Sequence, residues 1–129
     1  MPRESKGDPA LIYDMRAYSR KVASFVQGRS EAEYQADEVL RMAVERAIEL
    51  IGEPARYVSI PLRLAHPEVP WMLVQGQRHV LAHDYGEIIN AKIWRVATMH
   101  VPKMIPQLEA ILAEFPPPPT PSRSGESTQ

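Results

Sequence analysis

The chain has 129 residues, no cysteine, and 15 Lys and Arg against 16 Asp and Glu. This length is typical of one domain with a single core, and the absence of cysteine excludes disulfides and thiolate metal sites. A formal net charge of −1 excludes general electrostatic attraction to nucleic acid, so nucleic-acid binding would need a local basic patch.

The N-terminal part predicts a disordered start followed by a helix. Residues 1–8 carry nothing to bury and are expected to be disordered. Asp8 as N-cap and Pro9 at the first helical position predict a helix over about 9–27 that stops at Gly28. Its inward side chains recur at helical spacing: Leu11, Ile12, Met15, Tyr18, Val22, Phe25 and Val26. Arg16, Arg20 and Lys21 fall on its outward face, which we interpret as a solvated surface and, alternatively, as a phosphate-binding patch.

The next segment predicts an amphipathic helix opened by a capping box at Ser30 to Glu33. A break is expected near Ala36 and Asp37. Gly52-Glu53-Pro54 should interrupt the helix, because proline removes an amide and crowds the carbonyl four residues back. Residues 59–69 then read as a connector.

Pro70 can open the following helix, with Trp71, Val74 and Leu81 facing inward. The last apolar stripe, from Ile88 to Phe115, predicts a long helix with a kink or restart near Val101 because Pro102 and Pro106 lie inside it.

The whole pattern predicts an all-α protein, an up-and-down bundle of four to five helices, with no strand-like alternation. We expect one helical domain over residues 9–115 and a disordered, proline-rich tail over 116–129. No apolar run approaches the roughly 20 residues of a membrane span, and the start is not a signal peptide. A cytoplasmic protein that does not enter membranes is expected.

The stretch from Gly76 to Gly86 is the candidate site, since it concentrates more titratable and phosphate-binding groups than a packed helix needs. These groups are Arg78, His79, His83, Asp84 and Tyr85. On an ideal helix five positions separate Arg78 from His83 by about 140°, so one straight face cannot present both to a small substrate. Either the helix unwinds near His83 or two copies of the chain supply the pair. Gly86 is expected to end this helix.

The R-H-V-L-A-H-D-Y run resembles the R-(polar)-x-x-x-H-x-Y pattern of HepT-like toxins, small all-helical ribonucleases of the HEPN superfamily. Three flanking blocks look like family signatures in the usual order: I-E-L-I-G-E-P-A-R from Ile48, H-P-E-V-P-W from His66, and I-W-R-V with V-P-K-M-I-P-Q-L-E-A-I-L from Ile93 to Leu112. The resemblance covers roughly residues 10–115. It departs from the family at His79, where Asn is usual, and it implies that the helix before Pro54 continues with a kink to about Ser59.

The residues themselves fit RNA cleavage without a metal ion or other cofactor. Histidine can act as base or acid near neutral pH, and arginine offers a planar fork of donors to a phosphate. His83 and Arg78 would therefore promote attack of the 2′-OH, giving a 2′,3′-cyclic phosphate and a 5′-hydroxyl. The resemblance implies that Arg78 and His83 are catalytic and that His79, with Asp84, supports the site or contacts RNA.

The resemblance also implies partners. A two-fold homodimer would bring two Arg-His pairs into one cleft, which answers the angular problem above. An MNT-type nucleotidyltransferase antitoxin would transfer AMP to Tyr85. A different class of function stays open: a catalytically silent helical scaffold that binds a nucleotidyltransferase.

A metal site is the alternative for the two imidazoles, because His79 and His83 are four apart on one helical face. A catalytic zinc needs a third protein ligand, and neither Asp84 nor His100 is obviously placed to give one. We therefore expect no metal. His66 and His100 read as surface or hydrogen-bonded core histidines, and Trp71 and Trp94 read as packing.

Overall fold

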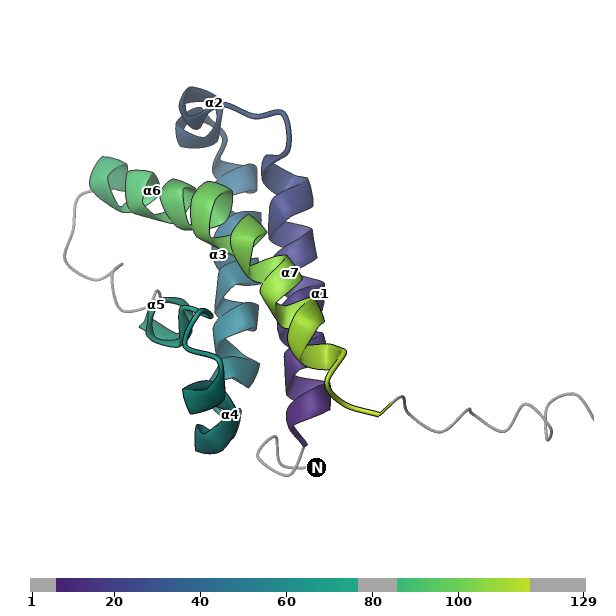
Figure 1. Ribbon diagram of the computed structural model, residues 1–129. Helices are drawn as coiled ribbons and strands as arrows, with labels where there is room; N and C mark the ends of the chain where they lie inside the picture. The colour runs from purple at the N-terminus through teal and green to yellow at the C-terminus, as the bar shows by residue number, and fades with distance from the viewer. Residues whose placement is uncertain (1–6, 77–85, 117–129) are drawn as a thin grey trace, which may run out of the picture.

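Every regular element in residues 7–76 and 86–116, the part of the chain that the computed structural model describes, is helical (Figure 1). The elements are α1 (Asp8–Val26), α2 (Glu31–Ala36), α3 (Glu38–Ala55), α4 (Ile60–Ala65), α5 (Trp71–Gly76), α6 (Gly86–Arg95), the π-helix η3 (Val96–His100) and α7 (Val101–Leu112). The all-α bundle expected from the apolar periodicity is confirmed. None of the described helices has both the length and the apolar character that crossing a membrane requires.

The helices α1 and α3 form the centre of the bundle, side by side and antiparallel, with α7 packed across α1 (Figure 1). The short α5 packs on α3, and α2 packs on α6. The largest fully buried side chains come mainly from α1, α3 and α7: Leu11, Ile12, Met15, Val22, Tyr34, Val44, Ile48, Ile51, Val58, Met104, Leu108 and Ile111. The buried side chains of the described residues form one hydrophobic core.

The first helix begins one residue earlier than expected, because Gly7 and not Asp8 is its N-cap. The Asp8 carboxylate instead accepts hydrogen bonds from the backbone N–H and the hydroxyl of Ser59, at 2.9 and 2.6 Å. Asp8 thus ties the start of α1 to the start of α4. At the other end, Gly28 follows the helix with φ +75°, a left-handed conformation that favours glycine.

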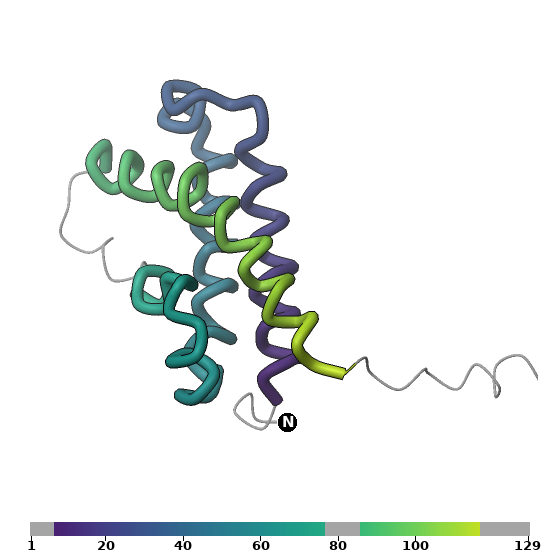
Figure 2. The backbone as a smooth tube through the Cα atoms, viewed as in Figure 1, coloured from purple at the N-terminus to yellow at the C-terminus, as the bar shows by residue number. Residues whose placement is uncertain are grey.

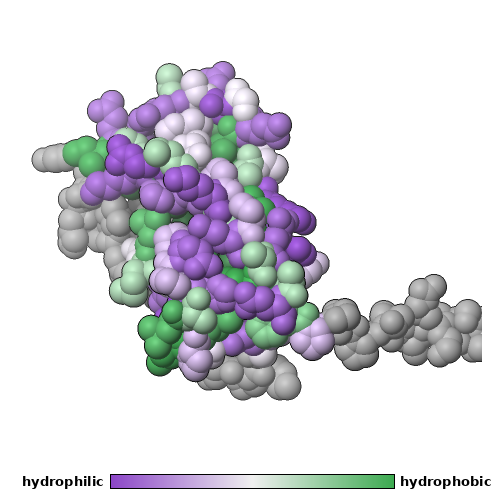
Figure 3. Space-filling model, in the orientation of Figure 1, coloured by the Kyte–Doolittle hydropathy of each residue, from purple (hydrophilic) through white to green (hydrophobic). Residues whose placement is uncertain are grey.

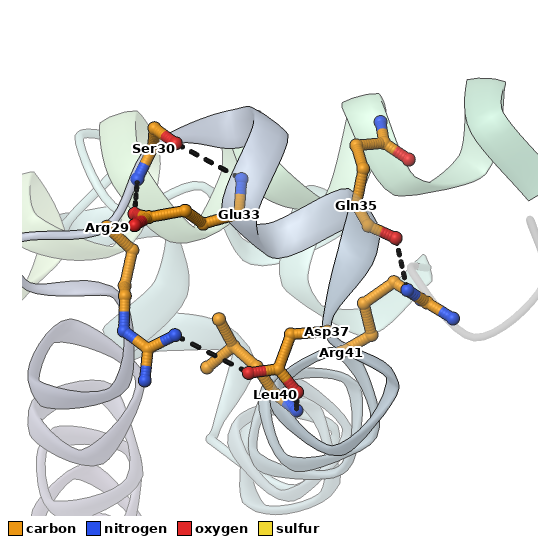
Figure 4. Close-up of polar contacts among 7 residues, drawn as sticks. All are labelled: Arg29, Ser30, Glu33, Gln35, Asp37, Leu40 and Arg41. Carbon is orange, nitrogen blue, oxygen red and sulfur yellow. Dashed lines mark hydrogen bonds and ion pairs between the residues drawn. The ribbon is translucent and has the colours of Figure 1, made fainter.

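The predicted capping box and break are both present (Figure 4). The Ser30 hydroxyl accepts from the Glu33 N–H at 3.1 Å, while the Glu33 carboxylate accepts from the Ser30 N–H at 2.8 Å. Asp37 then separates α2 from α3 and caps α3 by accepting from the Leu40 N–H at 3.0 Å. This bond is the largest cause of the lowered pKa of Asp37.

Two expectations for the middle of the chain are wrong. The helix α3 runs through Gly52 and Pro54 to Ala55, so it is neither interrupted there nor continued to Ser59. Pro54 offers no N–H to the carbonyl four residues back, and the helix ends one residue after it. The expected connector contains α4, whose N-cap Ser59 accepts from the Leu62 N–H at 3.3 Å. Pro61 lies in the first turn of α4, where its missing N–H costs nothing.

The C-terminal stripe forms α6 and α7 joined by η3, and the backbone changes direction between them (Figure 2). The Val101 N–H donates to the Val96 carbonyl five residues back. Pro102 has no N–H for the preceding turn, which explains why the regular α-helical pattern fails here. The predicted restart near Val101 is confirmed. Residues 1–6 and 117–129, where disordered ends were expected, lie outside the described part.

Candidate functional site

The five candidate site residues, Arg78, His79, His83, Asp84 and Tyr85, all lie in 77–85, outside the described residues. The structure instead describes the frame on either side of them. The segment leaves α5 after Gly76 and enters α6 at Gly86. The contacts that hold α5 and α6 in place therefore determine where the two ends of the candidate site segment lie.

The helix α5 is held against α3 by close backbone contact. A Cβ placed on Gly52 would lie 2.6 Å from the Val74 carbonyl oxygen, closer than real Cβ contacts. Only glycine permits α5 to approach α3 this closely. As predicted, Trp71 and Val74 are buried, and the Trp71 indole N–H donates to the His66 carbonyl at 3.0 Å. The end of α5 that leads to the candidate site is thus fixed on the core.

The helix α6 is held by its buried face and by α2. Ile89 and Ile93 enter the core. The Gln35 amide donates to the Glu87 carbonyl at 3.4 Å and accepts from the Asn90 amide at 3.1 Å. Gln35 is itself placed at the end of α2, where its backbone carbonyl accepts from Arg41 (Figure 4). These contacts fix α6 within its first two described turns.

Gly86 belongs to α6, and the helix that it is expected to end would lie in 77–85, outside the described residues. Gly86 is exposed, and a Cβ placed on it meets no atom of the described residues within 4 Å. The next residues, Glu87 and Ile88, are also exposed, so the surface immediately after Tyr85 is open. Ile88, expected in the apolar stripe, is 48% exposed.

An open groove of about 680 Å³ runs between α2 and α6, beginning beside this surface. Its lining residues are Glu31, Ala32, Gln35, Glu87, Ile88, Ala91, Lys92 and Arg95. Lys92 and Arg95 are three apart on α6 and so share a face. They were missed in the sequence, although their helical spacing from Ile88 already placed them on one side.

A buried phenol lies behind α6. The Tyr34 side chain is fully buried, packs on Trp94 with ring centroids 5.3 Å apart, and has a hydroxyl with no hydrogen-bond partner among the described residues. Burial, and next the charge of Glu45, raise the pKa of Tyr34. Burial likewise raises the pKa of Glu45. Trp94 therefore serves packing, as expected.

The remaining sequence candidates have structural roles. The His66 ring lies between Glu68 (Nδ1 to Oε2, 2.9 Å) and Glu114 (Nε2 to Oε1, 3.0 Å). In the basic group on α1, Arg20 pairs with Glu109, and the Arg16 guanidinium lies 5.1 Å from the centre of the Tyr13 ring. Two of the three basic side chains on α1 therefore make contacts within the bundle.

Among residues 7–76 and 86–116, no three or more His, Cys, Asp and Glu side chains are grouped to hold a metal ion. The pair that raised the metal alternative, His79 and His83, lies outside these ranges.

Comparison with known proteins gives a consistent result. A family model described as "Ribonuclease HepT-like" matches residues 15–111. A Methanocaldococcus jannaschii protein named "Putative RNase MJ1380" is 32% identical over 102 residues, covering 79% of this chain and 94% of its own length. A Caldanaerobacter subterraneus subsp. tengcongensis protein named "Putative RNase TTE0752" is 32% identical over 87 residues, with 67% and 78% covered.

A Thermococcus cleftensis protein named "Probable ribonuclease HepT" is 27% identical over 79 residues, covering 61% of this chain and 72% of its own. No solved structure matches the chain.

Proposed function

Because the chain belongs to the HepT-like ribonuclease family, we propose that it is an endoribonuclease that cleaves RNA without a metal ion and acts as a homodimer. The observation that carries this proposal is the extent of the family match. It spans residues 15–111, on both sides of the Arg78-x4-His83-x-Tyr85 motif. The motif thus occurs in the family's own context and not as an isolated pattern.

In the proposed reaction His83 takes the proton of the ribose 2′-OH, and the 2′ oxygen attacks the adjacent phosphorus. The bond to the 5′ oxygen breaks, and that oxygen receives a proton from water. Arg78 stabilises the negative charge that grows on the phosphoryl oxygens. The products are a 2′,3′-cyclic phosphate and a 5′-hydroxyl, and His83 is restored when it gives its proton to the hydroxide left by that water.

The frame supports a role for α6 in holding RNA. The chain has no overall basic excess, so RNA needs a local positive surface. Lys92 and Arg95 supply two positive side chains in the α2–α6 groove, which begins two residues after Tyr85 and also contains two glutamates. We propose that Lys92 and Arg95 contact phosphates of the bound strand, while Glu31 and Glu87 in the same groove disfavour a longer phosphate track there.

The proposed partner is an MNT-type nucleotidyltransferase antitoxin that transfers AMP to Tyr85. The AMP phosphate would pair with Arg78 and occupy the place of the scissile phosphate, so it would block cleavage by both charge and volume. The open surface at Gly86 and Glu87 favours approach of a second active site to this position.

To test this proposal, the purified chain and its Arg78→Ala and His83→Ala variants are each incubated with RNA of known sequence, with and without a chelator. We expect cleavage by the wild type in both conditions, cyclic phosphate ends, and no cleavage by either variant at unchanged helical content. Cleavage abolished by the chelator would refute the metal-free mechanism and favour the His79–His83 metal site. A wild type that cleaves no RNA but binds a nucleotidyltransferase would favour the silent scaffold instead.

A further inference from the structure

An apolar groove lies at the end of the bundle away from α6, between α4 and α5. Its volume is about 620 Å³, and its lining includes Ile60, Leu64, Pro67, Trp71 and Met72. Ile60, Leu64 and Met72 are 63%, 75% and 80% exposed. Apolar surface is also visible over α4 (Figure 3). Neighbouring apolar side chains exposed to this degree indicate a binding surface.

The C-terminal end of the described chain lies beside this groove. Glu114 pairs with His66 at 3.0 Å, and His66 is directly followed by Pro67 in the groove lining. Phe115 packs against the core, so the chain is still held on the bundle at its next-to-last described residue. Residues 117–129 continue from this point.

The sequence that continues suits such a groove. Residues 116–121 read P-P-P-P-T-P, in which Thr120 carries the only backbone N–H. Such a segment favours the polyproline II conformation and binds through its rings to apolar, aromatic-lined grooves. Six residues at about 3.1 Å each span roughly 19 Å, enough to reach along a groove that starts beside residue 114.

We propose that the proline-rich segment 116–121 of the same chain docks into the α4–α5 groove. Because the segment belongs to the same chain and starts beside the groove, docking is intramolecular and does not depend on the concentration of a partner. It would cover Leu64 and Met72 and fasten α5, the helix from which the candidate site segment leaves. This inference concerns a surface other than the candidate site and does not depend on the RNA chemistry.

Methionine oxidation tests the proposal in the full-length chain. Met72 lies in the groove, whereas Met42 on α3 and Met99 on η3 are similarly exposed, at 63% and 56%, and lie outside it. With dilute peroxide and short reaction times, we expect Met72 to oxidise several-fold more slowly than in a full-length variant with Pro117→Ser, Pro118→Ser and Pro119→Ser. Met42 and Met99 should react equally in both chains, as read by peptide mass spectrometry.

A second pair of variants changes the groove instead of the tail. Leu64→Glu should speed Met72 oxidation in the otherwise natural chain, whereas Val39→Glu, 78% exposed on α3, should not. Equal Met72 rates in the natural and the proline-substituted chains would overturn the proposal. Protection of Met72 that survives the proline substitutions and disappears on dilution would also overturn it, because a second copy would then be the occupant.

Discussion

The backbone of Gly52 in α3 lies against the carbonyl of Val74 in α5, at a distance that leaves no room for a side chain. Gly52 belongs to the I-G-E-P block on which the sequence resemblance rests, and Val74 lies two residues before the candidate site segment leaves α5. The glycine of this block therefore has a structural role, because its contact with Val74 sets the position of α5 and, with it, one end of the site segment.

Gly52→Ala should accordingly damage both stability and RNA cleavage. The added Cβ would lie 2.6 Å from a backbone atom, so α5 must shift. We expect a loss of about 1–3 kcal/mol in unfolding free energy, as for other overpacked sites, and lower cleavage. Urea unfolding and an RNA cleavage assay measure the two effects. Gly76→Ala, with open space around it, is the stability control, and equal stability of the two variants would contradict this account.

His66 should make stability depend on pH. Its two ring nitrogens face the Glu68 and Glu114 carboxylates, and two such bonds need both nitrogens protonated. The hydrogen bond to Glu68, and after it the interactions with Glu114, raise the pKa of His66. The folded chain therefore holds the proton more tightly than the unfolded chain. This stabilisation is complete below the unfolded pKa and is lost as pH rises through the folded pKa.

The measurement is the unfolding midpoint of the wild type and of His66→Gln from mildly acidic pH, above the range in which carboxylates take up protons, to mildly alkaline pH. The difference between the two should be largest at the acidic end and shrink as His66 loses its proton. His100→Gln, which removes the other described histidine, is the control for general titration. A difference that grows with rising pH would show that the sign is wrong.

Arg95→Glu should weaken RNA binding without unfolding the chain. Arg95 is exposed on α6 and lines the groove beside the candidate site. Losing one phosphate contact should lower the slope of log affinity against log salt by about 1. Arg46→Glu, at another exposed arginine on α3, is the matched control. Equal affinity and salt slope in the two variants would place the RNA elsewhere.

Helix boundaries could be predicted where they depend on residues close together in the sequence. The Ser30–Glu33 capping box and the Asp37 break depend on side chains within three residues, and the structure has both. The Asp8 role was missed because its partner, Ser59, lies 51 residues away. The connector expected over 59–69 leaves out the short α4, although Ser59 as N-cap and Pro61 in the first turn are a helix-start signal.

The candidate site shows the same division between local and distant information. Its residues are adjacent in sequence, so the motif could be recognised directly. Its frame could not, because the Gly52–Val74 and Gln35–Asn90 contacts join residues far apart along the chain. The roles that the motif predicts for Arg78 and His83 stay predictions, because both residues lie outside the described part of the chain.

Mixing an Arg78→Ala chain with a His83→Ala chain should restore activity that neither has alone. If each site takes one residue from each copy, a mixed dimer has one intact site of two. Random mixing in equal amounts then gives up to about a quarter of wild-type activity. Exchange of subunits is verified by native mass spectrometry. Mixed dimers that form without any cleavage, or a fully active monomer, would exclude a shared site.

The Tyr85→Phe variant should keep RNA cleavage and lose its inhibition by AMP transfer. The hydroxyl is the atom that would accept AMP, and it is not assigned to the cleavage reaction, so the variant should still cut RNA. Incubated with the nucleotidyltransferase partner and ATP, the wild type should gain AMP-sized mass and lose cleavage, whereas Tyr85→Phe should show neither change. Tyr13→Phe, at a tyrosine 55% exposed on α1, should behave as the wild type does. AMP-sized additions that persist in Tyr85→Phe would place the modification on another residue, and silencing without any mass change would mean that the partner inhibits by binding alone.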